Sequence, residues 1–362
     1  MKAVLLEEPE RFTAIDIAEP SAPAAGEALV QVHRVGVCGT DVAAYRGKMP
    51  LLSYPRILGH ELGVEVLALG DDVTNVAVGD RCCVEPYLNC GDCFACRRGG
   101  INCCERLEVL GVHTDGGLRP RFLVPARKLH SSTKLSLEQL ALVETLSIGA
   151  HAVRRAQLVR CQRKRESGAA SVVASSVAAP SVAVVGAGPI GLSVVAFAQQ
   201  AGASVTVIDR DERRLAFCAD TMRVDETVVA AKNDTADDLA NRLRAVGGGD
   251  LPSVVFDATG NPDSMAGAFD LVAPTGKLVF VGLTGAEVTF RPAHMHVREM
   301  TLLSSRNALP QDFAQVMAAL ESGSVATDPW ITHHTTLDTF IDDFPTYTDP
   351  ASGVIKAIVE VS

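Results

Sequence analysis

The fold is decided by residues 181–209, SVAVVGAGPIGLSVVAFAQQAGASVTVID. A strand-like run, SVAVV, leads into GAGPIG, and an apolar run of helical length follows before a second strand-like run, SVTVID. Strand, glycine turn, helix and strand in this order predict a βαβ unit with parallel strands. The alternation continues through a charged helix, DERRLAFCAD, and the runs SVVFDATG and KLVFVGL. We therefore expect a doubly wound parallel sheet of the Rossmann type, an α/β fold.

The spacing G-x-G-x-x-G in GAGPIG predicts a dinucleotide-binding turn, because it stands between a strand and a helix. Gly186 permits the tight turn, Gly188 lets the backbone approach a pyrophosphate, and Gly191 lets the helix pack closely on the strand. The first helical turn begins with Pro189, which has no N–H, and Ile190; the free N–H groups of the turn after the proline would face the phosphates. A structural glycine turn without a ligand is the alternative.

Asp209 ends the second strand of this unit, at the place where a carboxylate can accept both ribose hydroxyls of a dinucleotide. The same charge would repel a 2′-phosphate. Arg210 could favour that phosphate, and Arg214 in the next helix is a further candidate contact. The acid at the strand end predicts NAD rather than NADP as the cofactor.

A group of four cysteines predicts a metal site. Cys90, Cys93, Cys96 and Cys104 follow the spacing C-x2-C-x2-C-x7-C. Four thiolates this close can surround one tetrahedral zinc and leave no open position, so the site should be structural. Glu105 stands where an iron–sulfur motif would have proline, and a reducing compartment disfavours disulfides. Cys103 could replace Cys104 as the last ligand.

Composition limits the class of protein. The chain has 362 residues, long enough for two domains, with 47% hydrophobic and 21% charged residues. A formal net charge of −10 argues against a general surface for nucleic acid or anionic membrane. No signal peptide or membrane span is apparent, so we expect a cytoplasmic protein acting on a small molecule.

Two short motifs precede the cysteine group, CGTD at 38–41 and GHE at 59–61. Alone, a buried cysteine and a core histidine would explain them. With the cysteine group and the glycine loop in this order, the chain resembles the zinc-dependent medium-chain dehydrogenases, the alcohol dehydrogenase-like family. The resemblance covers nearly the whole chain and rests on VGVCGTD, GHELGVEV, GDRCCVEPYLNCGDCFAC, DGGL at 115–118 and GAGPIGL.

A further match, VETLSIGAH at 143–151, is typical of the polyol and sugar dehydrogenase branch. In that branch the resemblance implies a catalytic zinc on Cys38 and His60. It implies either Glu61 or Glu144 as the remaining ligand, directly or through water. Such a site has an open position for an alcohol oxygen and acts as a Lewis acid during hydride transfer to the nicotinamide. Two zinc ions per chain are therefore expected.

The residues around Cys38 suggest how a proton leaves. Thr40 is placed to pass the alcohol proton towards solvent, and Asp41 is expected to orient the histidine ligand. Many relatives have histidine where this chain has Ala43. The exit route therefore stays open between water, the ribose and Glu61.

The resemblance also implies a domain plan and an assembly. A GroES-like, mostly β catalytic domain would span 1–152, with the zinc lobe at about 86–108, and residues 304–362 would return to it. The NAD-binding domain would span 153–303 and carry a surface insertion at 161–180. Relatives form dimers or tetramers through sheet edges, so a homodimer or homotetramer is expected.

The carboxylate at position 144 favours a polyol, sugar or sugar acid such as galactonate or gulonate. Candidate substrate contacts are Tyr45, His113, Arg298, Glu299, Arg306 and Asn307. An L-threonine 3-dehydrogenase or a simple alcohol dehydrogenase is the nearest alternative. A zinc-free quinone-type reductase and a non-catalytic NAD-binding protein are alternatives of other classes.

Overall fold

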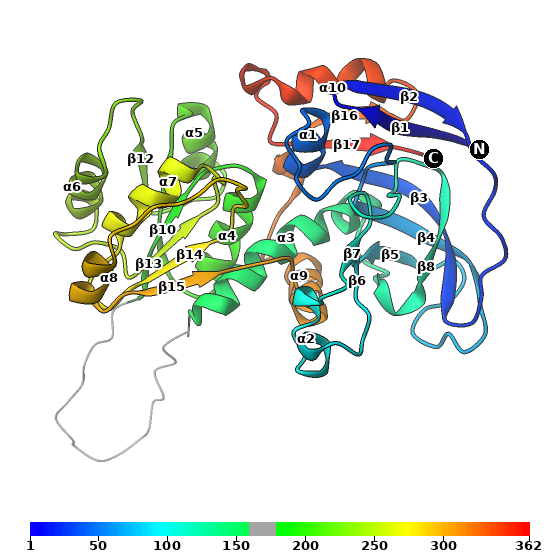
Figure 1. The fold of residues 1–362 in the computed structure, drawn as a ribbon, viewed down its shortest axis with the longest axis horizontal. Helices are drawn as coiled ribbons and strands as arrows, with labels where there is room; N and C mark the ends of the chain where they lie inside the picture. The colour runs from blue at the N-terminus through cyan, green and yellow to red at the C-terminus, as the bar shows by residue number, and fades with distance from the viewer. Residues whose placement is uncertain (159–178) are drawn as a thin grey trace, which may run out of the picture. The chain divides into compact units, whose positions relative to one another are not determined.

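The computed structural model describes residues 1–158 and 179–362, which form two compact units (Figure 1). One unit comprises Met1–Ile148 with Arg306–Ser362, and the other Gly149–Ser305. The expected divisions at 152/153 and 303/304 fall inside α3 (Leu137–Ala156) and β15 (Thr301–Ser304). Except for residues 179 and 180, the predicted insertion 161–180 lies outside the described residues. In the described part of the chain, no helix is long and apolar enough to cross a membrane.

The first unit is built on a seven-stranded sheet of order β16-β17-β3-β4-β5-β9, with β8 paired to β3. Two separate two-stranded sheets, β1-β2 and β6-β7, complete its β structure. In β3, buried and partly exposed side chains alternate from Ala28 to Val32, as the predicted strand requires. The strands of this unit are β1 (Lys2–Glu8), β2 (Arg11–Asp16), β3 (Glu27–Val37), β4 (Glu61–Leu69), β5 (Arg81–Val84), β6 (Tyr87–Leu88), β7 (Glu108–Val109), β8 (Arg121–Pro125), β9 (Leu129–Ser131), β16 (Ile331–Thr336) and β17 (Lys356–Glu360).

Helices close this sheet and start where the sequence places a cap. The Ser136 hydroxyl accepts the Gln139 N–H at 3.1 Å, and the Gln139 side chain accepts the Ser136 N–H at 3.0 Å. This reciprocal pair makes Ser136 the N-cap of α3. The helices with residues in this unit are α1 (Gly39–Tyr45), α2 (Phe94–Arg97), α3, α9 (Pro310–Glu321) and α10 (Phe340–Thr348).

The second unit confirms the predicted doubly wound sheet. Its six strands are parallel in the order β12-β11-β10-β13-β14-β15. Strands and helices alternate: β10 (Ser181–Val185), α4 (Pro189–Gln200), β11 (Ser204–Asp209), α5 (Glu212–Asp220), β12 (Glu226–Val229), α6 (Ala236–Val246), β13 (Val254–Asp257), α7 (Pro262–Gly267), β14 (Lys277–Phe280), α8 (Pro292–Arg298) and β15.

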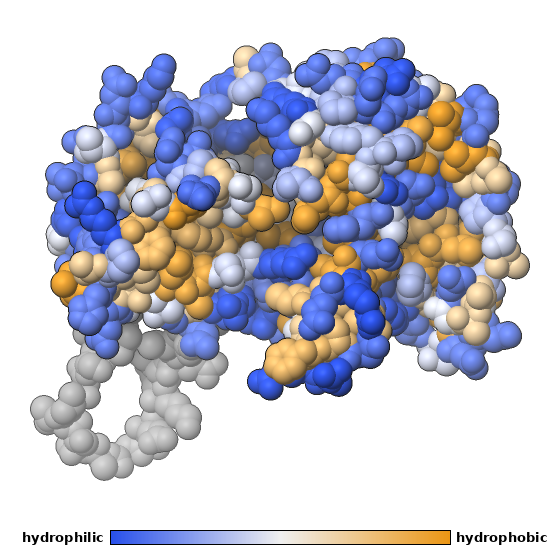
Figure 2. Space-filling model, in the orientation of Figure 1, coloured by the Kyte–Doolittle hydropathy of each residue, from blue (hydrophilic) through white to orange (hydrophobic). Residues whose placement is uncertain are grey.

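One edge of this parallel sheet carries exposed apolar side chains. Strand β15 ends the sheet, and α8 beside it in the sequence has no buried residue. Leu302 on β15 and Val297 on α8 are exposed, as are Leu283 and Phe290 in the segment between β14 and α8. Figure 2 shows apolar surface on this unit.

Candidate active site

The four predicted zinc cysteines converge in one loop. The Cys90 and Cys96 sulfurs are 3.9 Å apart, as are those of Cys93 and Cys104, and the Cys90 and Cys104 sulfurs are 3.4 Å apart. A tetrahedron with Zn–S bonds of about 2.3 Å has edges of roughly 3.8 Å. The cluster therefore fits a single zinc ion. Cys103 is exposed and outside the group, so the fourth sulfur is that of Cys104.

The local structure favours the thiolate form of Cys93 but not that of Cys104. Hydrogen bonds from the Cys96 and Glu105 backbone lower the pKa of the Cys93 thiol to about 6. Burial raises the pKa of Cys104 to about 11. A coordinating metal ion deprotonates such a thiol outright. The donor set is four sulfurs with no open position, which is the pattern of a structural site.

The second predicted metal group lies where β3 and β4 bring two motifs together. Cys38 follows β3 and precedes α1, and His60 precedes β4. One ligand atom each from Cys38, His60 and Glu61 lies within 4.8 Å of the others. A thiolate, an imidazole and a carboxylate are ligands that zinc accepts. These donors fit a catalytic zinc.

Asp41 faces the imidazole as expected. Its Oδ2 accepts the Cys38 N–H at 2.9 Å, and its Oδ1 lies 3.9 Å from His60 Nδ1. Both facing atoms are buried and have no hydrogen-bond partner in the described residues. Burial lowers the pKa of His60, but the nearby Cys38 sulfur and Asp41 carboxylate raise it well above its ordinary value. The potential at this point therefore favours a cation.

The two candidate carboxylates differ in their partners. Glu61 is buried, and each of its oxygens is 2.7 Å from Lys356 Nζ. Burial raises its pKa, but the Lys356 ammonium and His60 lower it below the usual range. Glu144 is buried on α3, and its Oε1 accepts a hydrogen bond from the Tyr87 hydroxyl. Burial raises the pKa of Glu144.

Lys356, Tyr87 and Thr145 are site residues that sequence reasoning missed. The apolar run VIKAIVEV contains two charged residues, Lys356 and Glu360; Glu360 is exposed, whereas Lys356 is only 1% exposed. A lysine in the middle of a buried strand needs an ionic partner. A lysine in such an apolar run could have indicated a buried ion pair, although not which acidic residue is its partner.

The glycine loop has the geometry that its spacing predicts. Gly186 has φ +99°, a left-handed conformation that favours glycine. A Cβ on Gly191 would lie 1.7 Å from the Gly186 carbonyl oxygen, so only glycine lets α4 approach. Pro189 begins α4 with Gly188 as its N-cap, and the side chain of Arg214 lies near Gly188. The free N–H groups at this helix start can receive a pyrophosphate.

Asp209 holds the same loop from the end of β11. Its Oδ2 accepts the Ala187 N–H at 2.6 Å, and its Oδ1 accepts the Asp211 N–H at 2.9 Å. Its carboxylate is thus fixed at the strand end, where the sequence predicts a ribose contact. Arg210, which follows it, is exposed.

Asp209→Asn is expected to raise the ratio of kcat/KM with NADP to that with NAD by roughly tenfold or more. The amide loses the charge that repels a 2′-phosphate and weakens a charged hydrogen bond worth about 1.5–3 kcal/mol. Steady-state kinetics with both cofactors measure the ratio. Asp211→Asn is the matched control, because Asp211 caps α5 nearby and should leave the ratio unchanged. An equal loss with both cofactors would contradict the assignment.

The remaining candidates fall into two groups. The Tyr45 ring stacks on Phe12 at 5.4 Å and packs against Phe344, so it belongs to an aromatic cluster. Arg298 donates to three backbone carbonyls, those of Phe269, Asp270 and Val272, which accounts for it without a substrate. Glu299 ends α8 in a left-handed conformation.

His113 and Thr40, by contrast, lie near the Cys38–His60 group. A Cβ on Gly111 would lie 2.9 Å from the Gly59 nitrogen, so the loop that carries His113 packs beside His60. Thr40 is partly exposed in the first turn of α1.

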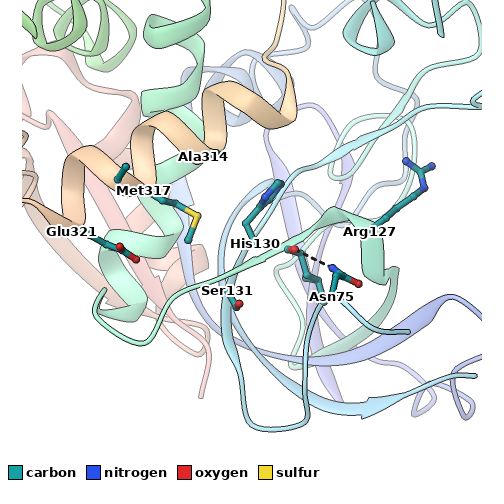
Figure 3. A pocket seen from close by; sticks show the side chains of 9 residues that line it. Asn75, Arg127, His130, Ser131, Ala314, Met317 and Glu321 are labelled. Carbon is teal, nitrogen blue, oxygen red and sulfur yellow. Dashed lines mark hydrogen bonds between the residues drawn. The ribbon is translucent and has the colours of Figure 1, made fainter. Parts of the chain in front are cut away.

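A pocket of about 480 Å³ also opens on the first unit. Figure 3 shows side chains of α9 facing those of β9 across it. Its lining shares no residue with the Cys38–His60 group and consists of Asn75, Arg127, Leu129, His130, Ser131, Ala314, Met317, Ala318 and Glu321. No candidate metal group of the described residues lies in this lining.

Two family profiles match the chain. The alcohol dehydrogenase GroES-like domain matches residues 24–134, and the zinc-binding dehydrogenase profile matches residues 189–322. These matches, with the parallel sheet, confirm the expected combination of a GroES-like domain and a Rossmann-type NAD-binding domain.

Curated relatives and solved structures match over almost the full length. L-galactonate-5-dehydrogenase of Escherichia coli (strain K12) is 35% identical and covers 93% of this chain and 92% of its own. L-arabinitol 4-dehydrogenase of Hypocrea jecorina is 31% identical and covers 96% and 90%. The rspB alcohol dehydrogenase structure from E. coli CFT073, complexed with NADH, has a TM-score of 0.87 at 27% identity and covers 100% and 99%.

Proposed function

The chain belongs to the family of zinc-binding alcohol dehydrogenases, and we propose that it oxidises a secondary hydroxyl of a polyol, sugar or sugar acid to a ketone with NAD. It is an oxidoreductase with zinc and a nicotinamide dinucleotide as cofactors. The group formed by the partly exposed Cys38, the buried His60 and a buried carboxylate, Glu61 or Glu144, carries the proposal, because it supplies ligands for one catalytic zinc.

Each part of the chain has a role in this reaction. Zinc, when bound, supplies a Lewis acid that lowers the pKa of an alcohol, and NAD supplies the hydride acceptor. Asp41 orients the His60 ring, and Thr40 receives the alcohol proton and passes it to solvent. The N-terminus of α4 binds the pyrophosphate, and Asp209 binds the ribose. We infer these roles from the geometry of each unit, for the enzyme with zinc and NAD bound.

The substrate class within this proposal is supported by two observations. A buried glutamate, Glu144, stands at this position instead of a cysteine, as the resemblance to the polyol branch implies. L-galactonate-5-dehydrogenase and L-arabinitol 4-dehydrogenase, both at least 30% identical, are named for a sugar acid and a polyol. An L-threonine 3-dehydrogenase of Pyrococcus horikoshii is 27% identical, so threonine stays the nearest alternative substrate.

Arg306 favours a sugar acid within this class. It is exposed, and its guanidinium makes no ion pair or hydrogen bond to any described residue. Its charge, after burial, helps to lower the pKa of His113, so the two side chains are neighbours. Asn102 fixes the segment by donating to the Arg306 carbonyl at 2.8 Å. A free guanidinium beside the loop that packs on Gly59 suits a substrate carboxylate.

A panel of aldonates, polyols, threonine and simple alcohols with NAD tests the proposed function. We expect the highest kcat/KM on an aldonate or polyol, complete loss after chelation, and recovery with zinc. Arg306→Gln should raise KM for aldonates by roughly tenfold or more, because a charge-assisted contact is worth about 1.5–3 kcal/mol. KM for polyols should not change.

Three results would contradict these expectations. Activity that survives complete removal of zinc would exclude the proposed chemistry. A preference for threonine or ethanol would leave the dehydrogenase class intact but exclude the substrate class. An equal rise in KM for aldonates and polyols in Arg306→Gln would show that Arg306 does not contact the substrate carboxylate. Arg155→Gln, which changes an exposed arginine of the other unit, is the control for a general loss of positive charge.

A further inference from the structure

Arg127, an arginine outside the zinc lobe, is bonded to Asn89, the residue that directly precedes the first of the four zinc cysteines. Arg127 Nη1 donates to the Asn89 side-chain oxygen Oδ1 at 2.8 Å, and Arg127 Nη2 donates to the Asn89 backbone oxygen at 2.9 Å. A planar guanidinium that makes two such bonds fixes the orientation of its partner as well as its position.

The arginine determines which way the Asn89 amide faces. A guanidinium has donors and no acceptor, so the amide atom beside it must be the oxygen. The amide nitrogen therefore lies on the opposite side, where Nδ2 donates to Cys96 Sγ at 3.8 Å. In this way the contact with Arg127 directs an N–H group at one of the four zinc ligands.

Cys96 differs from two of its fellow ligands in the origin of its donor. Backbone N–H groups donate to the sulfurs of Cys93 and Cys104. Among the described residues, the side chain of Asn89 is the donor to Cys96. The loop itself positions a backbone donor, whereas a side-chain amide can rotate about its own bonds. The bond to Cys96 therefore depends on a group that holds this amide in place.

Such a donor matters because the loaded lobe is anionic. One zinc ion on four thiolates carries a formal charge of about −2. A hydrogen bond to a charged sulfur favours the charged form, which is the form that zinc requires. Partners that bond to metal ligands from outside change metal affinity by about 10–100-fold. The Asn89 N–H is thus placed to retain the lobe zinc.

Arg127 is well anchored for this role. It lies in the turn between β8 and β9, where Asn75 donates to the Ala126 carbonyl at 2.8 Å. On its other side, Lys128 is 1% exposed and paired with the buried Glu85. Figure 3 shows the Arg127 side chain extending from this turn, away from Asn75. Both neighbours of Arg127 are fixed within the first unit, so its guanidinium is a firm support for the lobe.

We propose that Arg127 is a positioning residue for the lobe zinc, which orients the Asn89 amide towards Cys96 and so slows loss of the metal. The inference rests on zinc at the four cysteines and not on the substrate of the reaction. Arg127 is exposed and lies outside the segment that carries the four cysteines, so their spacing does not identify it.

The test measures zinc release from the full-length protein to a coloured chelator. Arg127→Gln, Asn89→Ala and the double variant are compared with the wild type. The phase of release that is missing in Cys93→Ser belongs to the lobe. Arg121→Gln is the matched control, because Arg121 in the same unit is 43% exposed and also donates to a side-chain amide oxygen, that of Gln31 at 2.9 Å.

In Arg127→Gln and in Asn89→Ala we expect the lobe zinc to leave roughly tenfold faster, the lower end of the range for partners of metal ligands. The double variant should match Asn89→Ala within about twofold, because Arg127 acts through Asn89. Arg127→Lys should behave like Arg127→Gln, since an ammonium keeps the charge but not the two parallel donors. Arg121→Gln should match the wild type.

A second readout follows the bond to Cys96 itself. With cadmium in place of zinc, the NMR resonance of the four-sulfur site should shift in the same direction in Arg127→Gln and Asn89→Ala. It should not shift in Arg121→Gln. A resonance that moves in Asn89→Ala but not in Arg127→Gln would show that the amide keeps its orientation without the arginine, and would overturn the inference.

The release rates can also overturn the inference in three ways. Wild-type release from the lobe in Arg127→Gln would show that the arginine has no role there. An undiminished effect of Arg127→Gln in the Asn89→Ala background would mean that it acts by another route. Wild-type release in Arg127→Lys would mean that charge alone is sufficient. Absence of zinc from the four cysteines of the wild type would overturn the lobe site together with the inference and leave the proposed chemistry at Cys38 and His60 intact.

Discussion

Replacing His60 with alanine is expected to lower kcat/KM by roughly 10³-fold or more and to remove one of two zinc ions from the chain. The imidazole is one of the three ligands, a thiolate, an imidazole and a carboxylate, proposed to hold this zinc, so its loss should release the Lewis acid. That Lewis acid contributes several kcal/mol to the transition state, and each 1.36 kcal/mol is about tenfold in rate. Steady-state kinetics and elemental analysis of the purified variant measure both effects.

Three controls make the His60 result specific. NAD binding, followed by fluorescence titration, should survive, because the glycine loop belongs to the other unit. His130→Ala should keep two zinc ions and near wild-type kcat/KM, since His130 lies in the β9 pocket and not among the metal ligands. Zinc bound at the four cysteines should remain in His60→Ala. A variant with two zinc ions and full activity would show that His60 is not a ligand.

The sequence predicts best the features whose parts lie close together in the chain. The glycine loop and the four-cysteine group each span a short segment, so spacing alone determines which atoms can meet. The cap of α3 at Ser136 is equally local, because its partner Gln139 is three residues away. The run DRCCVEPY has the composition of one strand, but β5 ends at Val84 and β6 begins at Tyr87. Pro86 has no N–H to donate to the ladder, which explains the break.

The features that sequence could not supply depend on contacts between distant strands. Glu61 and Lys356 are 295 residues apart, and only the order β17-β3-β4 brings them together. Tyr87 reaches Glu144 across a separation of 57 residues. A motif therefore identified the candidate carboxylates, but tertiary structure decided their partners.

Replacing Cys93 with serine is expected to remove the lobe zinc and to destabilise the first unit by more than about 4 kcal/mol, the range typical of a lost structural metal. The three remaining thiolates bind zinc more weakly. In such loops the free energy of metal binding contributes directly to the free energy of folding. Differential scanning calorimetry should show a lower Tm for this unit. Elemental analysis should show one zinc per chain in place of two.

Cys103→Ser is the matched control for the lobe, because Cys103 neighbours Cys104 in sequence but is exposed and outside the sulfur group. It should keep two zinc ions and the wild-type Tm, whereas Cys104→Ser should behave like Cys93→Ser. The opposite result would make Cys103 the fourth ligand. Loss of the lobe zinc should also weaken substrate binding, because Asn102 in the lobe donates a hydrogen bond to the Arg306 carbonyl. We therefore expect Cys93→Ser to raise KM for aldonates more than for polyols, a difference that general destabilisation would not produce.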